Sequence, residues 1–344
     1  DLCTVNIDVT GWSRFNITWT NEKDVRARFE VAAGGLTGAA GGAGINMRHA
    51  YGAWQATPNF ELMAGWSTTP FSPLAPPQSL GTNSNLHIIL LGFGEFYSGR
   101  FPQVRGTYKF SDNCRLAVAL LDPVIVGSPY APSATPPAPV TGVSVSDNES
   151  TIPRIDVGLP TYFGPLKLYP SFFWHQQEFD NIAPGQGDDL DSWGISLGFV
   201  FGYGPLTVTG EFNMGENWAS TQSTVAALYS FAPYLMANGQ VSDTDEMAFW
   251  IDFALKLGPV TPHFLYGSAD GENDGMAGAA DDQERRTHAY VLGLTIPVAR
   301  TFMINPEIGY YDFDDDASFG TGGLNTPFDM GDQLIIGVRF TVVF

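Results

Sequence analysis

The chain has 344 residues and a formal net charge of -20 at pH 7, with 36 acidic and 16 basic side chains. Its 39 glycines, 25 phenylalanines and 13 tyrosines favour strands and turns over helices. The acidic balance argues against a nucleic-acid partner, because phosphate binding needs clustered Lys and Arg. No apolar run reaches the roughly 18 residues of a transmembrane helix.

The first half of the chain predicts a series of strands, because apolar and polar residues alternate along it. The expected ranges are 14–20, 25–33, 44–54, 58–66, 100–110, 113–122, 151–160 and 165–177. Each segment has one apolar face, and its opposite face carries polar or small residues. This pattern predicts a sheet whose two faces meet different surroundings.

The second half continues the alternation to the C-terminus. Strands are expected at 191–203, 205–215, 246–257, 260–268, 286–296, 301–313 and 333–344. In the last segment, every even position from Leu334 to Phe344 is large and apolar, whereas the odd positions include Gln333 and Arg339. This period of two identifies a strand with one face suited to lipid.

The connections between the second-half segments alternate in length. Short links at 202–205, 258–261 and 297–300 alternate with long acidic links at 216–243, 267–284 and 314–331. Short periplasmic turns and long extracellular loops are typical of outer-membrane barrels. The sequence therefore predicts an all-β chain, a single transmembrane antiparallel β-barrel domain over 1–344. Such barrels have even strand counts, so residues 3–9 are expected to complete about sixteen strands.

A secreted all-β binding protein is the alternative reading of the same alternation. A soluble sheet protein must cover its apolar faces, but here the opposite faces carry charged residues throughout and leave little to form an interior. The starting residue is polar and no signal peptide precedes it, so we expect that any leader is absent from this sequence.

A basic face runs along the first half of the predicted barrel. Its members lie between apolar positions of the opposite parity: Arg14, Arg26, Arg28, Arg48, Arg105, Lys109, Arg115, Arg154 and Lys167. Some of these are expected to pair on the same face, as Arg28 with Glu30 and Arg154 with Asp156. An excess of base survives such pairing, and a basic wall in a narrow aqueous channel attracts anions.

Residues 67–99 form a long segment with one charge, Glu95, and considerable apolar character. The segments "RHAYGAW", "FELMAGWSTTPFSP", "GRFPQVRGTYKF" and "TIPRIDVGLPTYFGPLKLYPSFFW" resemble porins of Gram-negative anaerobes. The terminal Phe344 resembles the outer-membrane assembly signal of such porins. The resemblance implies a trimeric barrel in the bacterial outer membrane. It also implies that 67–99 is the third loop, folded inward to narrow the pore, with Glu95 facing Arg28, Arg48, Arg105 and Arg115.

The function expected from these patterns is passive diffusion of small hydrophilic solutes, with a preference for anions. A solute-specific channel is the alternative within transport, in which Trp54, Trp250 and Tyr311 on the inner parity would guide the solute. The five histidines show no HExxH or i,i+4 pairing, so neither a zinc site nor an enzyme is expected.

Two remaining features concern ions and thiols. The acidic loop residues Asp270, Asp274, Asp314 and Asp316 are weak candidates for Ca²⁺ ligands, and loop acids could bridge divalent ions to lipopolysaccharide headgroups. No other cofactor is expected. Cys3 and Cys114 are both expected near the periplasmic rim, as one disulfide or as two thiols.

Overall fold

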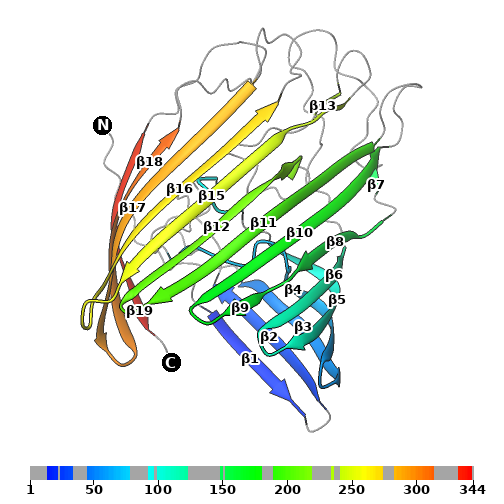
Figure 1. Ribbon diagram of the computed structural model, residues 1–344, viewed down its shortest axis with the longest axis horizontal. Helices are drawn as coiled ribbons and strands as arrows, with labels where there is room; N and C mark the ends of the chain where they lie inside the picture. Colours follow the sequence, from blue (N-terminus) through cyan, green and yellow to red (C-terminus); the bar gives the residue numbers. More distant parts are fainter. Residues whose placement is uncertain are drawn as a thin grey trace.

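The computed structural model describes residues 14–21, 24–33, 45–77, 92–96, 99–122, 148–149, 152–179, 189–218, 234–235, 241–273, 283–313 and 332–342. These residues form one large antiparallel sheet of long, tilted strands that curves around an interior (Figure 1). Among the described residues, no helix is long and apolar enough to cross a membrane.

The strands follow one another along the sheet in chain order. They are β1 (Arg14–Thr20), β2 (Val25–Ala33), β3 (Ile45–Thr57), β4 (Phe60–Thr68), β5 (Arg100–Ser111), β6 (Cys114–Leu121), β7 (Asn148–Glu149), β8 (Arg154–Gly158), β9 (Thr161–Phe163), β10 (Leu166–Phe179), β11 (Asp189–Tyr203), β12 (Leu206–Glu216), β15 (Asp245–Leu255), β16 (Thr261–Asn273), β17 (Gln283–Ala299), β18 (Phe302–Phe313) and β19 (Gln333–Val342). A separate small pair is formed by β13 (Tyr234–Leu235) and β14 (Val241–Ser242).

The strand count agrees with the predicted barrel. The main sheet has seventeen strands, but β7, β8 and β9 all pair along β10 and are three pieces of one segment, which leaves fifteen segments in the described residues. The predicted strand at 3–9 lies outside the described residues, as does Phe344. The all-β antiparallel class is confirmed, and the boundaries of β1 and β2 match the predicted ranges.

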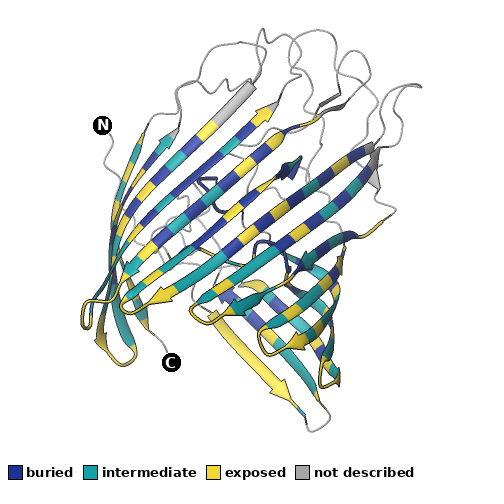
Figure 2. Ribbon diagram, in the orientation of Figure 1, coloured by how far each residue is buried: buried dark blue, intermediate teal, exposed yellow. Residues whose placement is uncertain are grey.

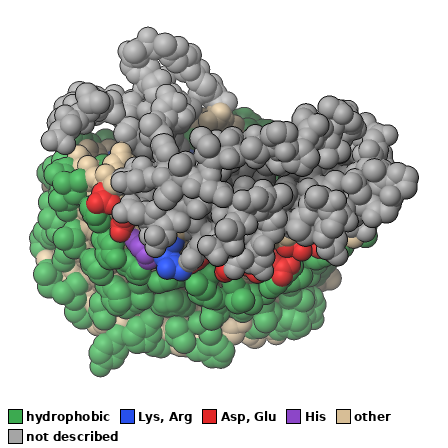
Figure 3. Space-filling view, turned by 90° about the horizontal axis from the view of Figure 1, so that it is seen from above, with side chains coloured by type: hydrophobic (Ala, Val, Ile, Leu, Met, Phe, Trp, Pro, Cys, Tyr) green, Lys and Arg blue, Asp and Glu red, His purple; other side chains and the backbone are tan. Residues whose placement is uncertain are grey.

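The alternation of the sequence becomes an alternation of exposure along most of the long strands (Figure 2), whereas β1 is exposed along its whole length. In β19 the even residues are exposed, with Ile336 at 70% and Phe340 at 64%, whereas the odd residues are partly covered. Hydrophobic side chains cover the visible outer wall in Figure 3. The apolar parity therefore points outward, as the alternation in the sequence predicts.

Tight hairpins connect several strands at one end of the sheet (Figure 1). Gly164, Gly204 and Gly258 have φ between +57° and +62° in the links from β9 to β10, β11 to β12 and β15 to β16. This left-handed backbone is easily adopted by glycine, which allows very short turns. These links include the predicted short turns at 202–205 and 258–261.

Trp54 is an exception to the predicted parity. The register of β2 against β3 shifts between Glu30, which pairs with His49, and Val31, which pairs with Met47. Arg48 is thus the additional residue of a β-bulge, and the faces of β3 exchange after it. Trp54 consequently lies on the outer face and is 52% exposed, so the prediction that it lines the interior is wrong.

Candidate functional site

The described parts of the segment between β4 and β5, residues 69–77 and 92–96, lie inside the curved sheet. Phe71 packs edge-to-face on Phe96 and Phe173, with ring centroids 5.0 and 4.7 Å away, and Phe96 contacts Trp218 at 4.7 Å. All four aromatic side chains are completely buried. Burial of this apolar cluster stabilises the inward position of the segment.

Polar contacts attach the same segment to the wall opposite β2 and β3. The Ser72 hydroxyl donates a hydrogen bond to Glu211 Oε1, and the Leu74 amide donates to Glu211 Oε2 at 3.2 Å. The Ser72 amide donates to Ser171 Oγ on β10, also at 3.2 Å. One buried carboxylate on β12 thus accepts two hydrogen bonds from the segment.

Gly94 brings the segment into direct contact with β15. Its φ is +119°, and a Cβ atom built there would lie 2.1 Å from the backbone oxygen of Phe249. Any other residue would collide with the strand, so this position requires glycine.

Glu95 lies away from the arginines that it is expected to face. Its neighbours in the chain, Gly94 and Phe96, contact β15 and Trp218, and the charge that acts on Glu95 is that of Glu211. Burial raises the pKa of Glu95 to about 8, and the Glu211 carboxylate adds to this shift. The expectation that Glu95 faces Arg28, Arg48, Arg105 and Arg115 is therefore wrong. The apolar composition of 67–99 predicts that the segment folds inward, but it does not predict which strands the segment packs on.

Arginines gather around Glu30 on the inner face of β1 to β3. Glu30 is 2% exposed; it pairs with Arg28, with Arg48 Nε at 3.2 Å and with Arg14 Nη1 at 3.8 Å. The side chains of Arg14 and Arg28 remain 31% and 35% exposed. Among the described residues, these three cations gather around one carboxylate. The predicted pairing of Arg28 with Glu30 is confirmed.

Two further arginines extend this inner face toward β5. Arg26 Nη2 pairs with Glu61 Oε1 at 2.7 Å, and its side chain is 44% exposed. Arg105 donates to the backbone oxygen of Thr68 at 3.3 Å. We call Arg14, Arg26, Arg28, Arg48 and Arg105 the basic wall, which has the two carboxylates Glu30 and Glu61 among its partners.

Arg154 is also on the inner face, but protein encloses it. Its guanidinium donates to both oxygens of Asp156, at 2.7 and 3.1 Å, and it lies 4.4 Å from the ring centroid of Phe173. The residue is 1% exposed. The predicted pair with Asp156 is confirmed, whereas the expected lumen contact of Arg154 is not what the structure shows.

Lys109, Arg115 and Lys167 lie near the short-turn ends of β5, β6 and β10. Lys109 forms an ion pair with Asp112 in the turn, which lowers the pKa of this carboxyl. Arg115 is opposite Lys109 in the strand register, and both Arg115 and Lys167 are exposed. These three cations lie on the rim and are separate from the basic wall.

Trp250 and Tyr311 have the predicted inward orientation, yet both are only 1% exposed. They belong to one buried cluster with Phe93, whose ring centroid is 5.2 Å from that of Tyr311. The inward-folded segment therefore covers the two aromatic side chains that the solute-specific alternative would use.

A hydrogen-bonded row crosses the inner face of β15 to β19. Asp252 Oδ2 is 3.2 Å from His263 Nδ1, and His263 Nε2 is 3.3 Å from Thr295 Oγ1. Asn305 Nδ2 donates to Thr295 Oγ1 at 3.0 Å, and Thr341 Oγ1 donates to Asn305 Oδ1 at 3.5 Å. The spacing of the five histidines in the sequence gives no sign of this row. The inward parity of its members was the available signal.

The ion and thiol predictions concern positions that are largely outside the described residues. Asp270 accepts from Arg286 Nε at 2.8 Å, while Asp274, Asp314 and Asp316 are not among the described residues. The Ca²⁺ hypothesis stays a prediction. Cys114 is a free thiol that accepts a hydrogen bond from Thr161 Oγ1 at 3.7 Å, and Cys3 is not described.

Several solved structures of bacterial outer-membrane proteins are similar to this chain. The outer membrane channel DcaP of Acinetobacter baumannii has a TM-score of 0.64 at 17% identity, over 87% of this chain and 79% of that one. The anion-selective porin from Comamonas acidovorans has a TM-score of 0.60 at 12% identity, over 97% and 91%. Salmonella typhi OmpF, in complex with daunomycin, has a TM-score of 0.56 at 10% identity, over 95% and 88%.

The chain has the fold of the bacterial outer-membrane porins. The structural resemblance covers most of the chain and confirms the resemblance drawn from the sequence. At the level of sequence, no family model and no curated protein matches the chain. Identities of 10 to 17% show the porin fold alone. Which solute passes depends on the side chains that line this chain's own interior.

Proposed function

We propose that the chain forms a water-filled channel in the bacterial outer membrane, through which small hydrophilic solutes diffuse passively, with a preference for anions. The basic wall carries this proposal. Five arginine side chains gather on this inner face, and those of Arg14, Arg26 and Arg28 are 31%, 44% and 35% exposed. Cations at a narrow aqueous passage raise the local concentration of anions.

The exposed apolar side chains of the outer face support a location in the outer membrane. Large apolar side chains project outward from strands all around the sheet, including Ile17, Leu197 and Ile336, which are 54%, 46% and 70% exposed. Water would make such a surface costly, whereas lipid accommodates it. The same observation disfavours a secreted all-β binding protein.

The inward position of the described residues supports our proposal that the segment 67–99 narrows the channel. Its described residues pack on β10, β12, β15 and β17, and we infer that solute passes along the basic wall. Selection is then by size at this segment and by charge at the wall. No covalent step is involved, so we propose a channel rather than an enzyme.

A homotrimer and contacts with lipopolysaccharide belong to the same proposal. OmpT of Vibrio cholerae, whose structure in a trimer form has a TM-score of 0.55 to this chain at 13% identity, provides a precedent for the oligomer. Acidic residues such as Asp270, near the end of β16, would meet anionic headgroups through divalent ions such as Ca²⁺.

Liposome swelling tests the diffusion step. Liposomes that contain the purified protein should swell in isotonic solutions of small sugars, at rates that fall steeply as the sugar becomes larger. Protein-free liposomes are the control. Swelling equal to that of the control would contradict a channel. If one sugar enters rapidly while smaller sugars enter slowly, the result would favour the solute-specific alternative.

A further inference from the structure

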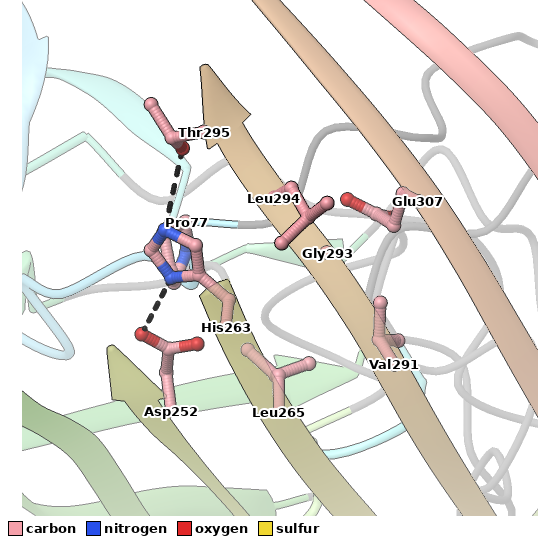
Figure 4. A pocket seen from close by; sticks show the side chains of 9 residues that line it. All are labelled: Pro77, Asp252, His263, Leu265, Val291, Gly293, Leu294, Thr295 and Glu307. Carbon is pink, nitrogen blue, oxygen red and sulfur yellow. Dashed lines mark hydrogen bonds and ion pairs between the residues drawn. The ribbon is translucent and has the colours of Figure 1, made fainter. Parts of the chain in front are cut away.

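The pocket beneath Pro77 lies on the wall opposite the arginines. Its polar lining residues are Asp252, His263, Thr295 and Glu307, and its apolar ones include Leu265 and Val291. Figure 4 shows the His263 ring between Asp252 and Thr295, with Glu307 on a neighbouring strand. The passive channel described above gives this pocket no role.

The row of hydrogen bonds has one consistent direction. Thr341 and Asn305 donate toward Thr295, whose hydroxyl hydrogen can then go to His263 Nε2. A neutral His263 with its hydrogen on Nδ1 donates in turn to Asp252 Oδ2. Every donor in the row thus points toward Asp252, which is its final acceptor.

Asp252 retains one unused acceptor. Asp252 is 2% exposed, and its Oδ1 atom is buried and has no hydrogen-bond partner among the described residues. A buried carboxylate oxygen without a donor is costly, so the site favours a ligand that supplies one. Glu307 adds a second carboxylate to the pocket, although Arg339 is close enough to offset part of its charge.

The residues that line the pocket restrict which kind of hydrogen-bond donor can bind there. Among the described residues, no three His, Cys, Asp or Glu side chains are grouped so that they could hold a metal ion. The buried side chains of Leu265 and Val291 would contact carbon atoms of a ligand. A small aliphatic amine in its protonated form supplies both a cationic N–H donor and an apolar body.

We propose that the Asp252–His263–Thr295 pocket binds small aliphatic ammonium ions, with Asp252 Oδ1 accepting an N–H hydrogen bond. His263 and Thr295 are positioning residues that hold the Asp252 carboxylate in place. The pocket would give the channel interior a site for organic cations that is separate from the anion-attracting basic wall.

Ethylammonium and tetramethylammonium provide the test on the wild-type protein. They have the same charge, but only ethylammonium has N–H donors. In a saturation-transfer NMR titration of the detergent-solubilised protein, ethylammonium should bind at least about tenfold more tightly than tetramethylammonium or glycerol, the gain expected for a hydrogen bond to a charged group. Binding of tetramethylammonium or glycerol as tight as that of ethylammonium, or no binding of ethylammonium, would overturn the proposal.

Two variants locate the site. Asp252→Asn should weaken ethylammonium binding about tenfold or more. Asp245→Asn removes the same charge from an exposed position on the same strand and should change binding less than twofold. Unchanged binding in Asp252→Asn would assign the amine to another site. Because this measurement does not require conduction, its failure is distinct from failure of the channel proposal.

Discussion

The two inner walls of the barrel differ in how they treat charge. On β1 to β5, the arginines of the basic wall keep part of their surface exposed around a small number of carboxylates. On β10 to β18, the acids Glu211, Asp252 and Glu307 are at most 6% exposed, and the inward-folded segment contacts Glu211 directly. We propose that a solute in the passage meets these partly exposed arginines, whereas the three acids are covered.

Removing Arg154 from its buried ion pair with Asp156 is the change with the largest expected effect on stability. Arg154→Gln leaves Asp156 buried without its cation and should lower the free energy of unfolding by about 3 to 5 kcal/mol. Since Arg154 is not part of the exposed basic wall, anion preference should remain. Denaturant unfolding in detergent and reversal potentials in bilayers measure the two properties. A large change in selectivity with normal stability would place Arg154 in the lumen after all.

Gly94→Ala should release the inward-folded segment from β15. The added methyl would collide with the Phe249 backbone oxygen, and overpacking of this kind costs about 1 to 3 kcal/mol. Single-channel recordings should show larger or noisier conductance. Gly202→Ala, where a Cβ meets open space, is the matched control and should conduct normally. Identical recordings for both variants would refute the close packing of this segment.

Exchange of the basic wall arginines should change selectivity. In a variant with Arg28→Gln and Arg48→Gln, we expect the anion-to-cation permeability ratio to fall by about three- to tenfold, because potentials of several kT act along such walls. Arg115→Gln with Lys167→Gln removes two cations from the rim and should shift the ratio less. A larger shift in the rim variant would reverse our assignment of the two groups.

The pH response of Glu95 is the smallest expected effect. Its pKa is raised to about 8 in the folded protein, above the ordinary value of 4.5. The folded state therefore holds more protons than the unfolded state between these values, and stability should fall as pH rises from about 5 to about 8. Melting temperatures of the wild type and of Glu95→Gln should differ in their slope over this range. Parallel slopes would contradict a buried, protonated Glu95.

The sequence predicts the barrel well because one physical rule governs it. Alternation of apolar and polar residues fixes which side chains point outward, and it places the arginines and Trp250 inside correctly. It fails at Trp54, because a single bulge at Arg48 exchanges the two faces of β3.

The interior is less predictable because it depends on contacts between distant segments. Glu95 packs near Glu211 because Phe71, Phe93 and Phe96 find aromatic partners on that wall. No local pattern in 67–99 encodes this choice. The row from Asp252 to Thr341 likewise combines five strands, each of which contributes one polar residue to the inner face.

A reversal potential measured in planar bilayers under a salt gradient tests the central claim most directly. With potassium chloride at different concentrations on the two sides, exposed arginines and covered acids should give a potential of the sign that corresponds to chloride moving faster than potassium. Raising the ionic strength should weaken this preference, because the wall charges become screened. A potential of the opposite sign at low salt would show that the acids, and not the arginines, control the passage.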